Sequence, residues 1–168
     1  DFLQEAQITS QLEHPGIVPI YQVGATPDGR PCYSMRLIHG QTLRQAIDDY
    51  HKFPVEQKSE RRLAKRRLLN HLASVCRTIA YAHSKGVLHR DIKPENIMLG
   101  EFGEAIILDW GLAKSSNSEQ ILVDDTYVDE QATVYSTQVR GTLAYLSPEQ
   151  AHGEKTRITS ASDIFALG

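Results

Sequence analysis

Hydrophobic and polar positions in the first forty residues change from a helical to an extended spacing. Residues 1–13 place apolar side chains three and four positions apart, which predicts an amphipathic helix. His14-Pro15-Gly16 ends that helix, because proline lacks the amide donor and glycine allows a turn. Two extended runs, residues 17–23 and 32–38, flank the turn signal Pro27-Asp28-Gly29 and predict an antiparallel pair of strands.

Helical spacing returns in the next forty residues. Thr42 is a favoured N-cap residue and precedes a short amphipathic stretch. A longer helix is predicted from Lys58 to about Ser84, and Gly86 is well placed to end it. The predicted buried face of this long helix consists of Leu68, Leu72, Val75, Ile79 and Ala82.

The remainder of the chain combines a short hairpin with a long polar stretch. Apolar runs at residues 97–99 and 105–108 flank a glycine-containing loop and predict two antiparallel strands. Residues 112–140 are polar and only weakly periodic, and so long a loop in a compact domain is normally functional or disordered. Residues 163–168 predict the start of a buried helix, and Asp1 falls within a helical pattern. We therefore expect the sequence to be a piece of a longer protein.

Composition and charge narrow the class of protein. The 168 residues are 40% hydrophobic and 23% charged, which is typical of one globular domain. No apolar run approaches the roughly 20 residues of a membrane span. Cys32 and Cys76 are too few for a disulfide framework or a zinc site, and no signal peptide is recognisable. We expect a cytoplasmic domain without membrane contact in this segment, although the parent protein could carry an anchor.

A basic run opens the predicted long helix. It consists of Arg61, Arg62, Lys65, Arg66 and Arg67. Such a run can bind nucleic acid, but the whole chain has a net charge of −3 and the run lies on an amphipathic helix. A solvated helix face is the favoured interpretation, so no nucleic-acid partner is predicted.

Residues 89–111 hold the residue types that phosphoryl transfer requires. The first part is His89-Arg90-Asp91-Ile92-Lys93-Pro94-Glu95-Asn96, and Asp109-Trp110-Gly111 follows it. The reaction needs metal ions held on the phosphates, a carboxylate near the attacking hydroxyl and a cation near the developing charge. An isolated Asp near an Asn is usually a turn or a helix cap. The whole block is far more specific than that.

This block resembles the eukaryotic-like (Hanks-type) serine/threonine protein kinases of bacteria, and the resemblance is colinear over almost the whole chain. It implies an α+β, two-lobed protein-kinase-like fold, truncated at both ends. Residues 1–168 would be a partial catalytic domain. Residues 1–38 would be the remnant of the small lobe, and residues 39–168 the first part of the large lobe.

The resemblance also implies a role for each residue of the block. Asp91 would accept or orient the proton of the substrate hydroxyl, and Lys93 would lie near the transferring phosphoryl group. Asn96 and Asp109 would bind Mg²⁺, or Mn²⁺ in its place. A lysine two residues after the catalytic aspartate accompanies serine/threonine specificity in the family. His89 would be structural and stack under Trp110.

ATP is the nucleotide that the resemblance implies. Met35 falls at the gatekeeper position, and the main chain of Arg36 and Ile38 would bond the adenine edge. Met98 would pack against the base. Glu5 would pair with the family's ATP-binding lysine, which is absent from these residues together with the glycine-rich loop. We therefore expect residues 1–168 alone to be poorly stable and inactive, although the parent is active.

Residues 112–149 resemble an activation segment, with Gly141-Thr142 and Ser147-Pro148-Glu149 as its closing motifs. Arg90 would receive a phosphate that orders this segment. Thr142 would hydrogen-bond near the catalytic aspartate. In the family, Asp163 bonds the catalytic-loop backbone, and Glu149 pairs with an arginine that is absent here. The candidate phosphorylation sites are Thr133, Ser136 and Thr137.

The function implied by this resemblance is transfer of the ATP γ-phosphoryl group to Ser or Thr hydroxyls of proteins, including self-phosphorylation. Two alternatives stay open. A pseudokinase scaffold is disfavoured by Asp91, Lys93, Asn96 and Asp109, but the ATP-binding lysine cannot be inspected. A kinase acting on small molecules is disfavoured by the motifs that organise a peptide-docking loop.

Overall fold

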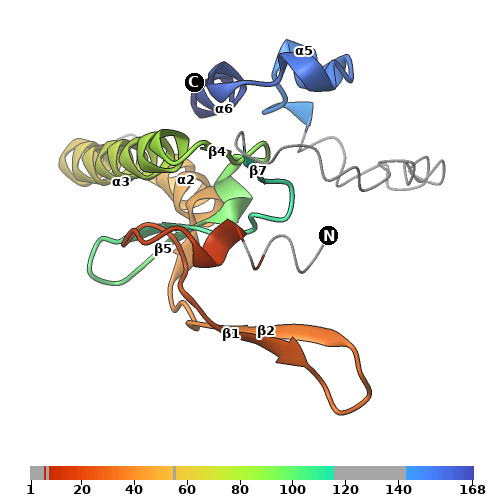
Figure 1. Ribbon diagram of the computed structural model, residues 1–168. Helices are drawn as coiled ribbons and strands as arrows, with labels where there is room; N and C mark the ends of the chain where they lie inside the picture. Colours follow the sequence, from red (N-terminus) through yellow and green to blue (C-terminus); the bar gives the residue numbers. More distant parts are fainter. Residues whose placement is uncertain (1–5, 7, 55, 116–142) are drawn as a thin grey trace.

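The computed structural model describes residues 6, 8–54, 56–115 and 143–168, and Figure 1 shows the arrangement of their helices and strands. A two-stranded sheet extends from one end of the molecule. A helix pair and a three-stranded sheet form the body, and two further helices pack on the opposite side from the two-stranded sheet. This mixed architecture agrees with the α+β fold expected from the sequence.

The two-stranded sheet is the hairpin of β1 (Ile20–Ala25) and β2 (Pro31–Met35), with Val23 opposite Tyr33. The predicted start of the first strand and the predicted end of the second were wrong, because residues 17–19 and 36–38 lie outside the strands. Pro19 has no amide donor for a ladder bond, so the regular pairing begins after it. Ile17 instead forms a bridge with Ile107 in the body of the molecule.

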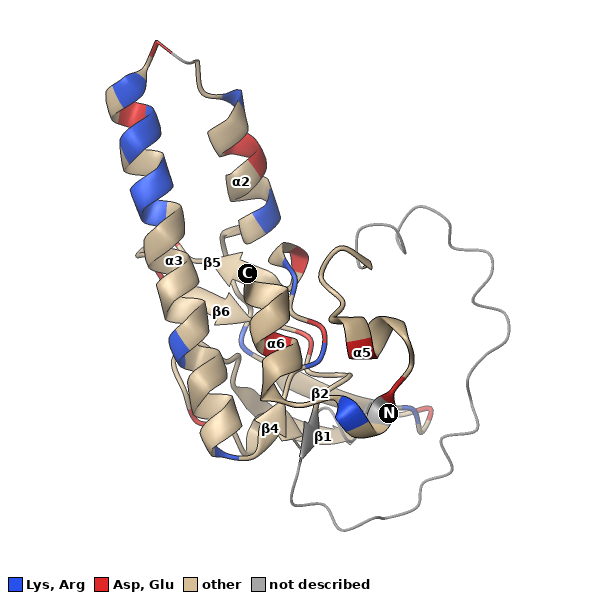
Figure 2. Cartoon of the chain, turned by 90° about the horizontal axis from the view of Figure 1, so that it is seen from above, with Lys and Arg blue, Asp and Glu red and all other residues tan. Residues whose placement is uncertain are grey.

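The helix pair confirms the predictions of helical spacing. Helix α2 (Leu43–Lys52) begins at the expected N-cap, where Thr42 and Gln45 form a capping box. Helix α3 (Lys58–Ser84) is 27 residues long, and Gly86 follows its end with a φ of 73°. Its fully buried side chains all lie in the second half, and Leu68 and Leu72 of the predicted buried face are only partly buried. Figure 2 shows that the first half projects beside α2 and carries most of its Lys and Arg side chains.

The central sheet has the order β3-β5-β6, with both pairs antiparallel. Its strands are β3 (Gln41–Thr42), β5 (Ile97–Leu99) and β6 (Ala105–Ile107), and the last two form the predicted hairpin. The Ile107 amide donates to the Gly16 carbonyl over 2.8 Å. Gly16 has to be glycine, because a Cβ atom there would overlap the side chain of Thr78 on α3.

Shorter elements complete the described chain. Strands β4 (Val87–Leu88) and β7 (Lys114–Ser115) pair in an antiparallel way, and the 3₁₀ turn η1 (Pro94–Asn96) precedes β5. The C-terminal part contains α5 (Pro148–Ala151), the turn η3 (Lys155–Arg157) and α6 (Ser160–Leu167).

The main hydrophobic core lies between the second half of α3 and the segments that cross it. Val75, Ile79 and Ala82 of α3 pack in one cluster with Ile107 and Trp110. The predicted burial of α6 was only partly correct, because Ile164 and Phe165 remain exposed in the described part of the chain. Among the described residues, no helix combines the length and apolar character needed to cross a membrane.

Candidate active site

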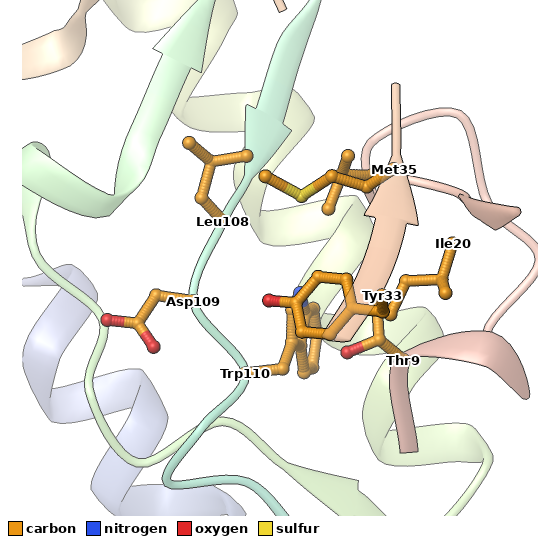
Figure 3. A pocket seen from close by; sticks show the side chains of 8 residues that line it. Thr9, Ile20, Tyr33, Met35, Leu108, Asp109 and Trp110 are labelled. Atoms are coloured by element: carbon orange, nitrogen blue, oxygen red, sulfur yellow. The ribbon is translucent and has the colours of Figure 1, made fainter. Parts of the chain in front are cut away.

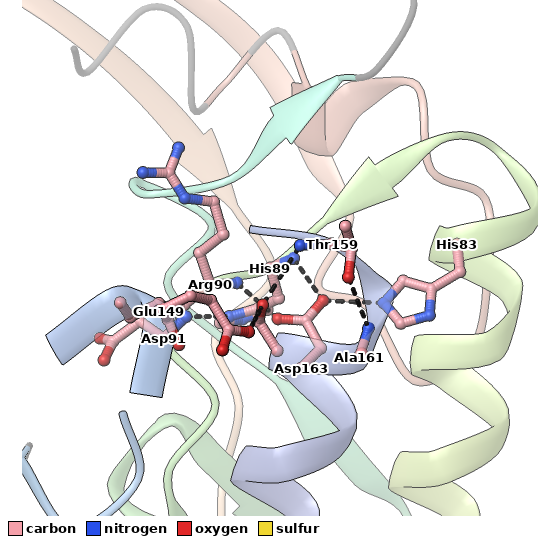
Figure 4. A network of polar contacts seen from close by, with 10 residues as sticks. His83, His89, Arg90, Asp91, Glu149, Thr159, Ala161 and Asp163 are labelled. Carbon is pink, nitrogen blue, oxygen red and sulfur yellow. Dashed lines mark hydrogen bonds and ion pairs between the residues drawn. The ribbon is translucent and has the colours of Figure 1, made fainter. Parts of the chain in front are cut away.

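The loop between β4 and η1 is held by a buried carboxylate of α6. Asp163 accepts hydrogen bonds from the backbone amides of His89 (2.9 Å) and Arg90 (2.8 Å), and its side chain is 1% exposed. His83 of α3 lies 2.7 Å from the same carboxylate. Figure 4 shows these groups converging on Asp163. The expected bracing role of Asp163 is therefore confirmed.

His89 is fully buried, as a structural residue should be. Its ring lies 4.6 Å from the ring of Trp110, centroid to centroid, but the two planes are inclined by 58°, so the expected stacking is not formed. Its Nδ1 accepts from the Asp91 amide at 3.3 Å. The Nε2 atom then carries the proton and donates to the Leu108 carbonyl at 3.3 Å. Burial lowers the pKa of His89, although Asp163 opposes the shift, so the neutral ring is favoured.

Three of the predicted site residues converge in this loop and the adjoining turn η1. The Asp91 carboxylate accepts from Lys93 Nζ at 2.6 Å and from Asn96 Nδ2 at 3.0 Å. Asn96 Nδ2 also donates to the Asp91 carbonyl at 3.0 Å. The nearby ammonium and amide hold the carboxylate in a defined orientation. Because the Asn96 nitrogen is used in this way, its amide oxygen is the atom suited to bind a cation.

Asp109 reaches the same region from the other side. The Leu108 amide donates to the Asn96 carbonyl at 2.8 Å, which joins the two segments directly before Asp109. Trp110 is buried in the core, whereas the Asp109 carboxylate is exposed and accepts from the Gly111 amide at 3.3 Å. The φ of Asp109 is 58°, in the left-handed region that non-glycine residues seldom adopt.

A cavity of about 320 Å³ separates this segment from the β1–β2 hairpin. Figure 3 shows Met35 and Tyr33 of β2 on one side and Leu108 and Trp110 on the other. Asp109 borders the cavity, and its carboxylate points away from Tyr33 and Trp110. Of the described residues, the lining set is Thr9, Val18, Ile20, Tyr33, Met35, Leu108, Asp109 and Trp110.

Comparison with known proteins decides the family. A family model described as the protein kinase domain matches residues 1–168. The chain belongs to this family. Three curated relatives carry the name serine/threonine-protein kinase PknD. The relative from Protochlamydia amoebophila is 41% identical over 177 residues, and those from Chlamydia caviae and Chlamydia pneumoniae are 36% and 37% identical.

These relatives are much longer proteins. Each alignment covers 99% of this chain but only 17% or 18% of the relative. The family membership confirms the resemblance to protein kinases that the block at residues 89–111 indicated.

Only some of the residues expected to contact the nucleotide line the cavity. Met35 and Asp109 border the same cavity, whereas Arg36, Ile38 and Met98 are outside its described lining. The expected residues outside the described part of the chain are Glu5, Thr133, Ser136, Thr137 and Thr142.

The donor set expected for a metal ion is small. The described residues contain no group of three or more His, Cys, Asp or Glu side chains that could hold a metal ion. Asp109 and Asn96 supply a carboxylate and an amide oxygen, which are the hard donors that Mg²⁺ prefers. Mg²⁺ commonly keeps several waters and takes further ligands from substrate phosphates, so two protein donors suit it.

Sequence reasoning overlooked two residues that support the site. Gln150 of α5 donates to the Arg90 carbonyl, and His83 contacts Asp163. The spacing of Ser147 and Gln150 is that of a capping box and could have drawn attention to Gln150. No local pattern distinguishes His83.

The family's arginine partner of Glu149 is not among these residues, but Glu149 does have a hydrogen-bond partner in the described part of the chain. Its carboxylate accepts a hydrogen bond from the Ser162 hydroxyl, and this bond is the main cause that lowers the pKa of Glu149. The reason is local geometry. Ser162 lies in the first turn of α6, and α5 places Glu149 beside it.

Proposed function

We propose that the chain is the catalytic-domain part of an ATP- and Mg²⁺-dependent serine/threonine protein kinase, with Mn²⁺ as an alternative ion. In the whole protein it transfers the γ-phosphoryl group of ATP to Ser or Thr hydroxyls of proteins, itself included. The observation that carries the proposal is the convergence of Lys93 and Asn96 on the Asp91 carboxylate. The names of the curated relatives support the same activity.

Each of these residues has a separate task in the proposed reaction. Asp91 orients the acceptor hydroxyl and takes its proton, and Lys93 holds this carboxylate while its positive charge faces the transferred group. Asn96 and Asp109 would hold the metal ion through oxygen atoms. When bound, the ion would supply positive charge to offset the negative charge of the ATP phosphates. Met35, Met98 and the main chain of Arg36 and Ile38 would surround the adenine, and Glu5 would pair with the ATP-binding lysine.

Regulation by phosphorylation is the second part of the proposal. Arg90 Nε is buried and has no hydrogen-bond partner among the described residues. A buried, unpaired guanidinium atom is costly, and a phosphate group would satisfy it. Thr133, Ser136 and Thr137 are the proposed donors of that phosphate, and Thr142 is proposed to lie beside Asp91. We place the domain in the cytoplasm, with protein substrates as its partners.

Transfer from labelled ATP by the full-length protein tests the activity. We expect Asp91→Asn and Asp109→Asn each to lower the rate by about 100-fold or more, because each removes a charge that acts on the reacting groups. Asp28→Asn is the matched control, since Asp28 lies in the exposed β1–β2 turn. Equal rates for the native protein and the two site variants would contradict the proposal.

A further inference from the structure

Arg90 adopts a strained backbone conformation directly before the catalytic aspartate. Its φ is 72°, in the left-handed region that is unfavourable for a residue with a Cβ atom. Such a conformation persists only where the surroundings hold it. Both backbone polar groups of Arg90 are in fact bound by side chains. Asp163 accepts from its amide at 2.8 Å, and Gln150 Nε2 donates to its carbonyl at 2.7 Å.

We propose that Gln150 is a positioning residue of the kinase, which acts by holding the Arg90 carbonyl and thereby orienting Asp91. The inference rests on the proposed function for its effect on catalysis. The Arg90 carbonyl belongs to the peptide bond that leads into Asp91. If this peptide rotates, the Asp91 amide loses its bond to His89 Nδ1, and the carboxylate changes its direction.

The side chain of Gln150 is itself oriented by its neighbours. Its Oε1 accepts from the Ser147 amide at 3.1 Å and from the Ser147 hydroxyl at 3.0 Å. The oxygen therefore faces Ser147, and the amide nitrogen faces Arg90. In the reverse orientation the NH₂ group would face the Ser147 amide, and the oxygen would face the Arg90 carbonyl. Both contacts would be unfavourable, so the hydrogen bonds define which atom of the Gln150 amide is the nitrogen.

Only an amide of this length serves both ends of the network. A glutamate would keep the acceptor for Ser147, because Glu is a standard residue at this position of a capping box. It would lack the N–H group for the Arg90 carbonyl. Gln150→Glu therefore removes one hydrogen bond on the catalytic loop and retains the helix cap.

The chain offers a matched control in α2. Gln45 occupies the same capping-box position, where its Oε1 accepts from the Thr42 amide at 2.8 Å. Among the described residues, Gln45 makes no bond to the catalytic loop. Gln45→Glu therefore reproduces the chemical change and its effect on a helix start, away from Arg90.

Two measurements on the full-length protein test the inference. For Gln150→Glu and Gln150→Ala, we expect kcat to fall about tenfold while KM for ATP stays within about twofold, because a misplaced catalytic group lowers the rate without loss of substrate binding. Hydrogen exchange at the Arg90 and Asp91 amides should accelerate about tenfold in the same variants, because their backbone opens more often. Gln45→Glu should change neither quantity.

The outcomes separate this inference from the proposed function. Equal kcat and equal exchange rates in Gln150→Glu and Gln45→Glu would overturn the role of Gln150. A rise of KM alone, with kcat unchanged, would also overturn it. If the native protein transfers no phosphoryl group, the proposed function fails, and the exchange rates still decide whether Gln150 holds Arg90.

Discussion

Arg90 and Asp109 are the two non-glycine residues in the described part of the chain with a positive φ, and they are held in different ways. Arg90 is bound at both backbone groups by Asp163 and Gln150, which come from separate helices. Asp109 has an exposed carboxylate whose described hydrogen bond is from the nearby Gly111 amide. The loop that carries Asp91 is thus fixed by distant parts of the chain.

This difference suits the tasks proposed for the two segments. A residue that orients a proton acceptor must be held by the protein before the substrate arrives. A metal ligand instead needs a carboxylate with unused acceptor capacity, and strain at such a position is typical of functional sites. The contrast predicts a large loss of stability when the supports of the first segment are removed and a small one when Asp109 is changed.

The largest expected effect is at Asp163. In Asp163→Ala, the amides of His89 and Arg90 and the side chain of His83 lose their acceptor inside the protein. We expect the free energy of opening of α3 to fall by about 3 kcal/mol or more, because buried donors without partners are costly. Native-state hydrogen exchange in α3 of the full-length protein measures this change.

Asp163→Asn is the informative companion variant. Its amide oxygen can still accept one of the backbone amides, but its NH₂ group faces the other donors. We therefore expect an intermediate loss of stability. A value for Asp163→Ala within about 0.5 kcal/mol of the native protein, as is usual for exposed sites, would show that the loop is held by other contacts.

The second expected effect concerns pH and His89. Burial lowers the pKa of this histidine in the folded protein, whereas the unfolded chain titrates near its ordinary value of about 6.5. Below that pH, the unfolded state therefore binds more protons than the folded state. The free energy of unfolding is highest above a pH of about 6.5 and decreases as the pH falls, by at most about 1.4 kcal/mol per pH unit for one group.

The experiment compares His89→Phe with the native protein from about pH 7 to pH 5. The variant keeps an aromatic ring beside Trp110 but does not titrate, so its opening free energy should fall less steeply with decreasing pH. His152→Phe is the control, because that histidine is exposed at the end of α5. Identical slopes for His89→Phe and the native protein would show that His89 does not contribute to the acid sensitivity.

Local sequence signals correctly predicted the helices and strands whose limits are set by residues close in the sequence. Thr42 starts α2 as expected, and the long helix and the β5–β6 hairpin have nearly the predicted limits. The limits of β1 were wrong because Ile17 pairs with Ile107, a contact that no local pattern contains. The half-burial of Leu68 has a similar cause, since the first half of α3 projects beside α2.

The candidate site likewise combines residues that local motifs predict with residues that only the tertiary structure brings in. Asp91, Lys93, Asn96 and Asp109 were predicted because their types and order are specific, and the first three do converge. The supports of the loop come from residues far along the chain. Asp163 was expected only through the family resemblance, and Gln150 was not predicted. Their roles depend on the packing of α5 and α6 against Arg90. Composition and residue spacing do not reveal this packing.

The smallest expected effect is on stability at Asp109. Because its carboxylate is exposed and bonds only the neighbouring Gly111 amide in the described part of the chain, Asp109→Asn should change the opening free energy of α3 by less than about 0.5 kcal/mol. Asparagine also tolerates a positive φ better than most residues, so the backbone strain does not increase. A loss comparable to that of Asp163→Ala would mean that both segments are held equally, and the contrast between them would fail.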